Sequence, residues 1–185
     1  MSKLGKKPIL IPKDTTVKIE SGKLILAGPK GSRELNINDK IYTTSIAKDN
    51  NLVIKLIKKN ENSNVMWGTT RSIINSAVIG VSVGFERILE LNGVGFRGIL
   101  KGDTLSLQLG FSHDVMYQIP KGIKLIVDKQ TTIKISGIDK ELVGKVVSEI
   151  KKLKPVEPYK GKGIKERGQY VLRKEGKNKY NEPVN

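Results

Sequence analysis

Each half of the chain passes once from a strand-like to a helix-like pattern of apolar residues. Apolar and polar residues alternate over short runs in the first 57 residues, and Gly, Pro and Asn separate the runs. From Asn62 the apolar positions follow helical spacing as far as Gly80, which we expect to end that helix. This order predicts an antiparallel sheet packed against one helix, with strands at residues 16–20, 23–27, 33–37, 41–47 and 52–57.

The second half repeats this plan. Its expected strands lie at residues 85–91, 96–101, 105–109, 115–119, 124–127 and 132–136. A helix then runs from a cap at Asp139 to Pro155, with its apolar residues on one face. Residues 11–28 and residues 119–137 share a pattern: Ile-Pro-Lys, then two strand-like runs, then a glycine. This pattern indicates that the two halves are related. The match needs one inserted residue, so chance is the alternative.

These patterns predict the α+β class, with two tandem related domains and an extended basic C-terminal tail. We place the domains at residues 1–82 and 83–153, and the tail at residues 154–185. The tail has few apolar residues, so we expect it to stay disordered until a partner orders it.

Positive charge gathers at the two ends of the chain. The net charge is +16, of which +7 lies in residues 151–185 and +4 in residues 1–18. A merely soluble surface would not need both ends to be basic, so the charge indicates a polyanionic partner, with nucleic acid the obvious class.

The composition excludes much chemistry. With Cys 0 and His 1, disulfides, thiol catalysis, zinc fingers and multi-histidine metal sites are excluded. We therefore predict no catalytic residue, no metal and no cofactor. The chain shows no targeting segment or membrane span, so we do not expect a membrane as a partner. Without a predicted catalytic residue, we also do not expect a small-molecule substrate.

Three motifs match known sites only superficially. Gly93–Gly98 fits a dinucleotide fingerprint, but the residues that follow alternate like a hairpin, whereas that site needs a helix. Gly95–Gly98 and Gly28–Gly31 fit the loop of KH domains, yet both lie between expected strands and not between helices. Ser112-His113-Asp114 holds the residue types of a hydrolytic triad, but chain neighbours point in different directions.

Three other residues have open interpretations. Trp67 is expected to anchor a core or an interface, with base stacking as the alternative. Arg71, one helical turn later, faces either solvent or phosphate. Arg97 lies in a glycine-rich loop that could approach phosphate closely.

The most informative segment is residues 155–165, Pro-Val-Glu-Pro-Tyr-Lys-Gly-Lys-Gly-Ile-Lys. Its prolines stiffen the exit from the second helix, and its glycines leave a narrow backbone that could lie close to another polymer. Its lysines present ammonium groups, and Tyr159 could stack on a base. An ordinary Lys/Gly linker is the alternative interpretation.

At these residues the chain resembles the bacterial type of the universal "L six" family of large-subunit ribosomal proteins. Glu157–Ile164 is close to the family signature, and the likeness covers nearly the whole chain, including Gly28–Gly31, Trp67–Ser72, Leu91–Arg97 and Leu109–His113. The resemblance implies two duplicated α+β domains. It also implies a structural, non-enzymatic constituent that binds large-subunit rRNA near the sarcin–ricin loop and stalk base, beside neighbouring ribosomal proteins and docking translational GTPases.

The resemblance also implies which residues bind rRNA. Carried over by position, they are Lys154, Tyr159, Lys160, Gly161, Lys162, Gly163, Lys165, Arg173, Lys174 and Lys177. From their local sequence pattern we add Arg71 and Arg97 as further candidates. Two residues depart from the family pattern: Val156 stands where Pro is usual, and Glu166 where an aromatic residue is usual.

Amino-acid usage bears on the source of the chain. It has 28 lysines against 6 arginines, with frequent Asn and Ile, as an A+T-rich genome would produce. We therefore favour the mitochondrial matrix as the location, with the bacterial cytoplasm or another organelle as alternatives.

Lysine-rich ends with few aromatics favour recognition of folded RNA by shape and phosphate, with about 6–8 phosphate contacts from the tail. The alternatives are a free-standing RNA chaperone and an RNA-modifying enzyme.

Overall fold

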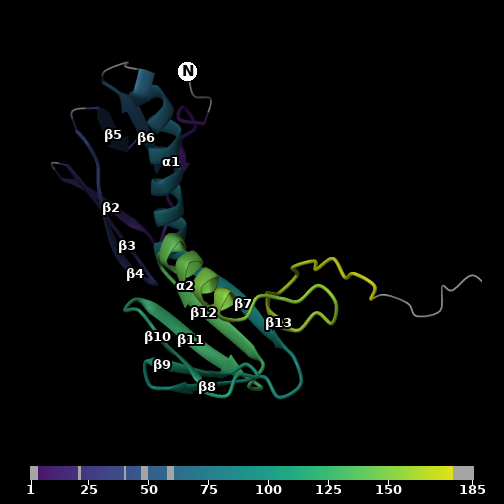
Figure 1. Ribbon diagram of the computed structural model, residues 1–185. Helices are drawn as coiled ribbons and strands as arrows, with labels where there is room; N and C mark the ends of the chain where they lie inside the picture. Colours follow the sequence, from purple (N-terminus) through teal and green to yellow (C-terminus); the bar gives the residue numbers. More distant parts are fainter. Residues whose placement is uncertain (1–3, 21, 40, 47–49, 58–60, 177–185) are drawn as a thin grey trace, which may run out of the picture. The chain divides into compact units, whose positions relative to one another are not determined.

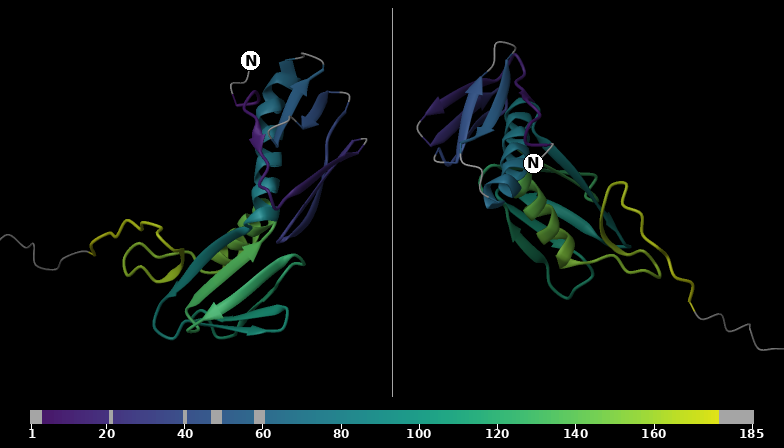
Figure 2. Two further views of the ribbon diagram at one scale, coloured as in Figure 1. Left: turned by 180° about the vertical axis from the view of Figure 1, so that it is seen from behind. Right: turned by 90° about the horizontal axis from the view of Figure 1, so that it is seen from above.

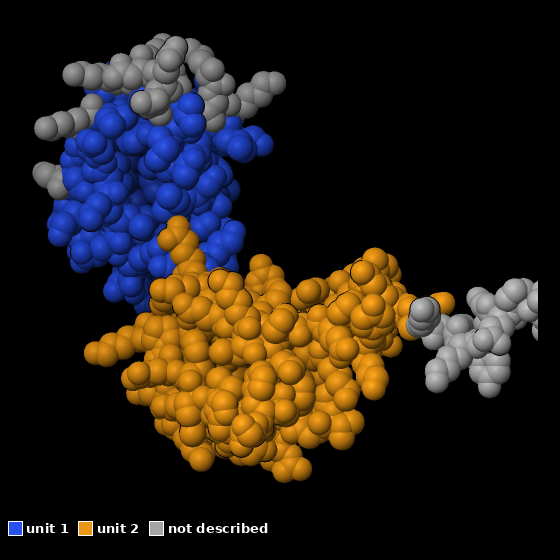
Figure 3. Space-filling model, in the orientation of Figure 1, with its two compact units in different colours: residues 1–85, 137–140 blue, residues 86–136, 141–185 orange. Residues whose placement is uncertain are grey.

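The computed structural model describes residues 4–20, 22–39, 41–46, 50–57 and 61–176 (Figure 1). The chain divides into two compact units, Met1–Phe85 with Gly137–Lys140 and Glu86–Ser136 with Glu141–Asn185 (Figure 3). Each unit combines strands with one helix, which confirms the predicted α+β class with two tandem domains. The boundaries at residues 82 and 153 stay a prediction.

The first unit holds two three-stranded sheets and the helix α1 (Glu61–Ser82). One sheet has the order β1-β6-β5 and the other β2-β3-β4, and their pairings are antiparallel. Leu24, Leu52 and Ile74 are among the side chains that bury the contact of α1 with β3, β4 and β6. The strands are β1 (Ile9–Leu10), β2 (Thr16–Glu20), β3 (Lys23–Gly28), β4 (Gly31–Asn36), β5 (Tyr42–Ile46) and β6 (Asn51–Leu56).

The expectation that Gly80 ends α1 is wrong. The helix continues to Ser82, and the amides of Val83 and Gly84 both donate to the carbonyl of Ile79, at 2.9 and 3.1 Å. Gly84 has a φ of +83°, a conformation that glycine adopts without strain, so Gly84 closes the helix. Gly80 is needed for another reason: a Cβ there would overlap the carbonyl of Ile138.

The second unit holds a three-stranded sheet, β10-β9-β8, and a four-stranded sheet, β11-β12-β7-β13. The helix α2 (Lys140–Leu153) lies along the four-stranded sheet (Figure 2). Its buried residues are Val143, Val146, Val147 and Ile150. Tyr117 on β10 donates a 2.6 Å hydrogen bond to Glu149 on α2, and burial, then this bond, raises the pKa of Tyr117. The strands are β7 (Phe85–Asn92), β8 (Arg97–Lys101), β9 (Thr104–Gln108), β10 (Val115–Gln118), β11 (Ile123–Asp128), β12 (Thr132–Gly137) and β13 (Gly163–Glu166).

The strand β13 belongs to the tail. It pairs antiparallel with β7 from Gly163 opposite Asn92 to Glu166 opposite Leu89, and Ile164 is buried. The expectation of a tail that is disordered without a partner is therefore wrong for these residues, because the domain's own sheet orders them.

Neither α1 nor α2, the helices in the described part of the chain, has the length and hydropathy that a membrane span requires.

Candidate nucleic-acid interface

The tail forms a closed loop directly after α2. The amide of Glu157 donates to the carbonyl of Lys162 at 2.8 Å, and the amide of Ile164 donates to the carbonyl of Lys154 at 2.9 Å. Inside this ladder, the amide of Gly161 donates to the carbonyl of Glu157 at 3.0 Å. These backbone bonds fix the ends of the loop, which presents Tyr159 and the lysines near its tip to solvent.

A glycine at position 163 is required by the chain itself. Its φ is +139°, and a Cβ would lie 2.6 Å from both the carbonyl oxygen of Pro155 and the Cα of Val156. Real Cβ atoms are not found that close, so only glycine lets the two arms of the loop approach. The narrow backbone that the sequence suggested for contact with another polymer is used here for contact within the loop.

The structure brings five of the predicted residues to one concave surface. A hollow of about 570 Å³ lies between the tail and the turn that follows β7. The amide of Lys174 donates to the carbonyl of Pro158 at 3.0 Å and so ties the later tail to the loop. The predicted residues that line the hollow are Lys160, Gly161, Lys162, Lys165 and Arg173. We call this surface the tail hollow.

The cations of the tail have two kinds of surroundings. Lys160, Lys162, Arg173 and Lys174 are exposed. The ammonium of Lys165, in contrast, lies 3.3 Å from Oε2 of Glu90, and that of Lys154 lies 4.5 Å from the centre of the Phe111 ring. The first group is open to an external anion, whereas Lys165 and Lys154 already have partners within the domain.

Other predicted residues lie elsewhere. Arg71 donates to the backbone carbonyls of Lys7 and Pro8, at 3.3 and 3.1 Å, and so holds the N-terminal segment against α1. Arg97 is exposed at the start of β8. Lys177 falls outside the described residues.

The structure also explains the motifs that only resembled catalytic or nucleotide sites. The residues after Gly98 form the β8–β9 hairpin, as expected, where a dinucleotide site needs a helix. Asp114 accepts a 3.4 Å hydrogen bond from Ser106, while the His113 ring stacks on Phe111.

Trp67 is buried and donates to the carbonyl of Ile54 at 3.0 Å, which confirms a core anchor. No group of three potential metal ligands occurs among the described residues.

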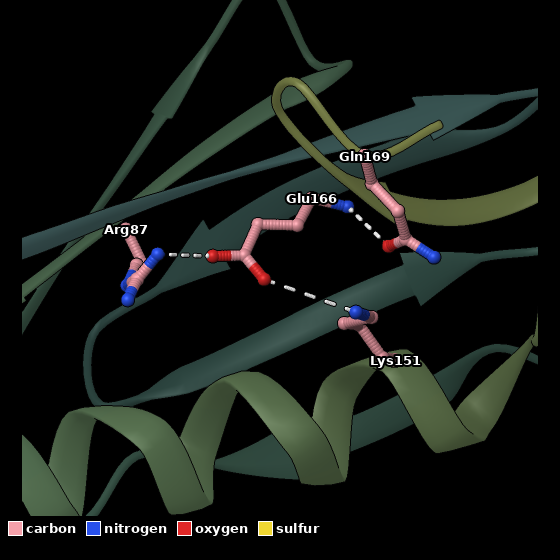
Figure 4. Close-up of polar contacts among 4 residues, drawn as sticks. All are labelled: Arg87, Lys151, Glu166 and Gln169. Atoms are coloured by element: carbon pink, nitrogen blue, oxygen red, sulfur yellow. Dashed lines mark hydrogen bonds and ion pairs between the residues drawn. The ribbon is translucent and has the colours of Figure 1, made fainter. Parts of the chain in front are cut away.

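Sequence reasoning singled out Glu166 only as a departure from the family pattern and missed the contacts that it makes. Glu166 accepts a 2.8 Å hydrogen bond from Nη1 of Arg87, and its other oxygen lies 3.8 Å from the ammonium of Lys151 (Figure 4). The amide of Glu166 also donates to Oε1 of Gln169, at 3.3 Å. Arg87 and Lys151 come from β7 and α2, so no local pattern in the tail could have indicated them.

The chain matches known proteins along nearly all its length. The family model described as Ribosomal protein L6 matches residues 11–84 and 92–167. The chain is 44% identical over 179 residues to large ribosomal subunit protein uL6 of Beijerinckia indica subsp. indica, covering 97% of this chain and 100% of the relative. With the same coverage, it is 45% identical over 181 residues to the protein of that name from Phenylobacterium zucineum, and 43% over 180 residues to that from Sinorhizobium fredii.

Proposed function

Because the chain belongs to the ribosomal protein L6 family, we propose that it binds large-subunit rRNA near the sarcin–ricin loop and the base of the stalk. Its role in the large ribosomal subunit is structural and not enzymatic, as it is for the family. We assign the RNA contact to the closed loop at residues 154–164 and to the tail hollow beside it.

One observation carries this assignment. Four exposed cations lie on two joined segments: Lys160 and Lys162 on a loop whose backbone is fixed by its own hydrogen bonds, and Arg173 and Lys174 on the later tail, which the Lys174 amide ties to that loop. Lysine binds phosphate as a point charge, and a preformed loop loses little conformational entropy on binding. The surface therefore suits the phosphates of a folded RNA better than the edges of particular bases.

The location on the RNA also determines the neighbours. A protein at the base of the stalk lies beside other large-subunit proteins and near the site where translational GTPases dock. We assign this chain a supporting role there: it holds the RNA, and the RNA contacts the factor.

The compartment is a separate part of the proposal. The relatives named above are bacterial. The high ratio of lysine to arginine and the frequent Asn and Ile support a mitochondrial ribosome encoded in an A+T-rich genome. Fractionation of the source cells, followed by detection of the protein in purified organelles, tests this point. Detection in the bacterial cytoplasm would overturn it.

Directed hydroxyl-radical probing tests the RNA site. The chain has no cysteine, so Lys162→Cys provides a single attachment point for an iron chelate. Bound to the large subunit, this variant should cleave rRNA in and around the sarcin–ricin loop. A chelate at Lys124→Cys, exposed on β11 at the other edge of the same sheet, is the matched control and should give a different pattern. Identical cleavage from both positions, or none from Lys162→Cys, would contradict the proposed site.

A further inference from the structure

The short strand β13 carries the loop into the sheet, and little apolar burial holds it there. It has four residues and lies at the edge of the sheet. Ile164 is its one buried hydrophobic side chain, and residues 155–163 include two prolines and two glycines. A short edge strand of this kind needs further contacts to stay in register.

Two carboxylates supply such contacts, one on each face of the β7–β13 pair. Directly opposite residues share a face, so Glu166 lies on the same face as Leu89, and Lys165 lies with Glu90 on the other. On the first face, Glu166 of β13 pairs with Arg87 of β7 and Lys151 of α2 (Figure 4). On the second, Glu90 of β7 pairs with Lys165 of β13 at 3.3 Å and Arg167 at 4.0 Å.

The partners of Glu166 are particularly suited to fixing the loop. They join β13, where the loop ends, to the neighbouring strand β7 and to the last turn of α2, from which the loop starts. The amide of the next residue, Arg167, donates to the carbonyl of Ile88 at 2.9 Å and continues the pairing beyond β13. Loss of the Glu166 contacts would remove the side-chain ties of this arm to Arg87 and Lys151 and leave it held by the backbone pairing with β7 and the burial of Ile164.

We propose that Glu166 is a positioning residue for RNA binding: its carboxylate holds β13 on the sheet, so that Lys160 and Lys162 meet the RNA in a preformed arrangement. This inference rests on the proposed function. It predicts the opposite of what net charge predicts, since a carboxylate in a basic tail should otherwise weaken binding to a polyanion.

Glu166→Gln tests the two predictions against each other. The probe is an in vitro transcript of the large-subunit rRNA from the source genome, bound to the full chain at about 0.15 M salt. We expect Glu166→Gln to bind three- to tenfold more weakly, although its net charge is one unit more positive. Glu86→Gln is the matched control, because it makes the same charge change at an exposed position of β7 and should leave binding equal or slightly tighter.

A charge swap provides the second, independent variant. Glu166→Arg alone should bind still more weakly than Glu166→Gln, and adding Arg87→Glu should recover most of the affinity, because the 87–166 pair is restored at the wild-type net charge. Hydrogen exchange of the Arg167 amide should quicken in the single variants and slow again in the double variant. Circular dichroism melting shows that each variant is folded.

The outcomes separate the inference from the proposed function. Binding by Glu166→Gln that is as tight as that of Glu86→Gln, or a charge swap that recovers nothing, overturns the role of Glu166 while the RNA contact stands. A wild-type chain that does not bind the transcript overturns the proposed function itself.

Discussion

The ammonium of Lys165 lies 3.3 Å from Oε2 of Glu90, the residue directly opposite it on the neighbouring strand. The sequence places Lys165 in a row with Lys160 and Lys162, and all three appear equivalent as phosphate ligands. The structure separates them: Lys160 and Lys162 are exposed on the loop, whereas Lys165 is paired within the sheet. The three lysines should therefore respond differently to substitution.

Lys165→Ala should lower the stability of the protein. It leaves Glu90 with only the more distant Arg167 and weakens the attachment of β13. Partly exposed ion pairs contribute about 0.2–1 kcal/mol, so the free energy of unfolding in urea should fall by that amount. Lys124→Ala, at an exposed position on the other edge strand, should leave the free energy unchanged. Equal free energies for the two variants would contradict the assigned role of Lys165.

RNA binding should depend on salt less steeply than the whole charge of the tail suggests. Among the predicted tail cations that the structure describes, Lys154 and Lys165 already have partners, and the exposed residues Lys160, Lys162, Arg173 and Lys174 remain for phosphate. Four contacts give a slope of about −3 in a plot of log affinity against log salt, and the double substitution of Lys160 and Lys162 by Ala should reduce it to about −1.5. A filter-binding titration over about 0.05–0.3 M salt, in which added salt increasingly screens the charges, measures both slopes. A slope of zero would rule out a phosphate-based contact.

Gly163→Ala should disrupt the loop. The new methyl group would meet the backbone of Pro155 and Val156, and alanine is strained at a φ of +139°. We expect a loss of about 1–3 kcal/mol in the free energy of unfolding. Gly144→Ala is the control: it lies at an exposed position within α2 with no atom near its added methyl group, and should stabilise the protein by up to about 1 kcal/mol. If the two variants shifted stability in the same direction, the close approach at Gly163 would be wrong.

Gly80→Ala should destabilise the first unit, although it lies inside a helix. Helix propensity alone predicts a gain of about 1 kcal/mol from this change. The structure predicts a loss, because the added Cβ would overlap the carbonyl of Ile138 and force α1 away from residues 137–140. Differential scanning calorimetry gives the answer directly: the melting temperature should fall, and a rise would show that the contact between Gly80 and Ile138 is absent.

Local patterns predicted most of the fold. The strands from β2 to β12 and both helices lie within about two residues of their expected positions, because alternation and helical spacing record which face of an element is buried. The strands β1 and β13 were missed. Ile9–Leu10 is too short to alternate, and Gly163–Glu166 has one apolar residue and pairs with a strand more than 70 residues earlier.

The candidate site was predictable only in part. Its glycines and lysines form a short sequence motif, so they could be found without the structure. Whether Lys165 faces solvent depends instead on its pairing with Glu90, and the attachment of its strand depends on the pairing of Glu166 with Arg87 and Lys151. Such ion pairs have no fixed spacing, and only the fold reveals them.

Co-sedimentation with ribosomes tests the central claim most directly. The full chain, expressed in cells of the source organism, should travel with the large subunit through a sucrose gradient. The Lys160→Ala, Lys162→Ala double variant should be largely lost to the top fractions at moderate salt, while Lys124→Ala stays with the subunit. A wild-type chain that remains at the top of the gradient, or a double variant that sediments as the wild type does, would contradict a large-subunit protein held in place by this loop.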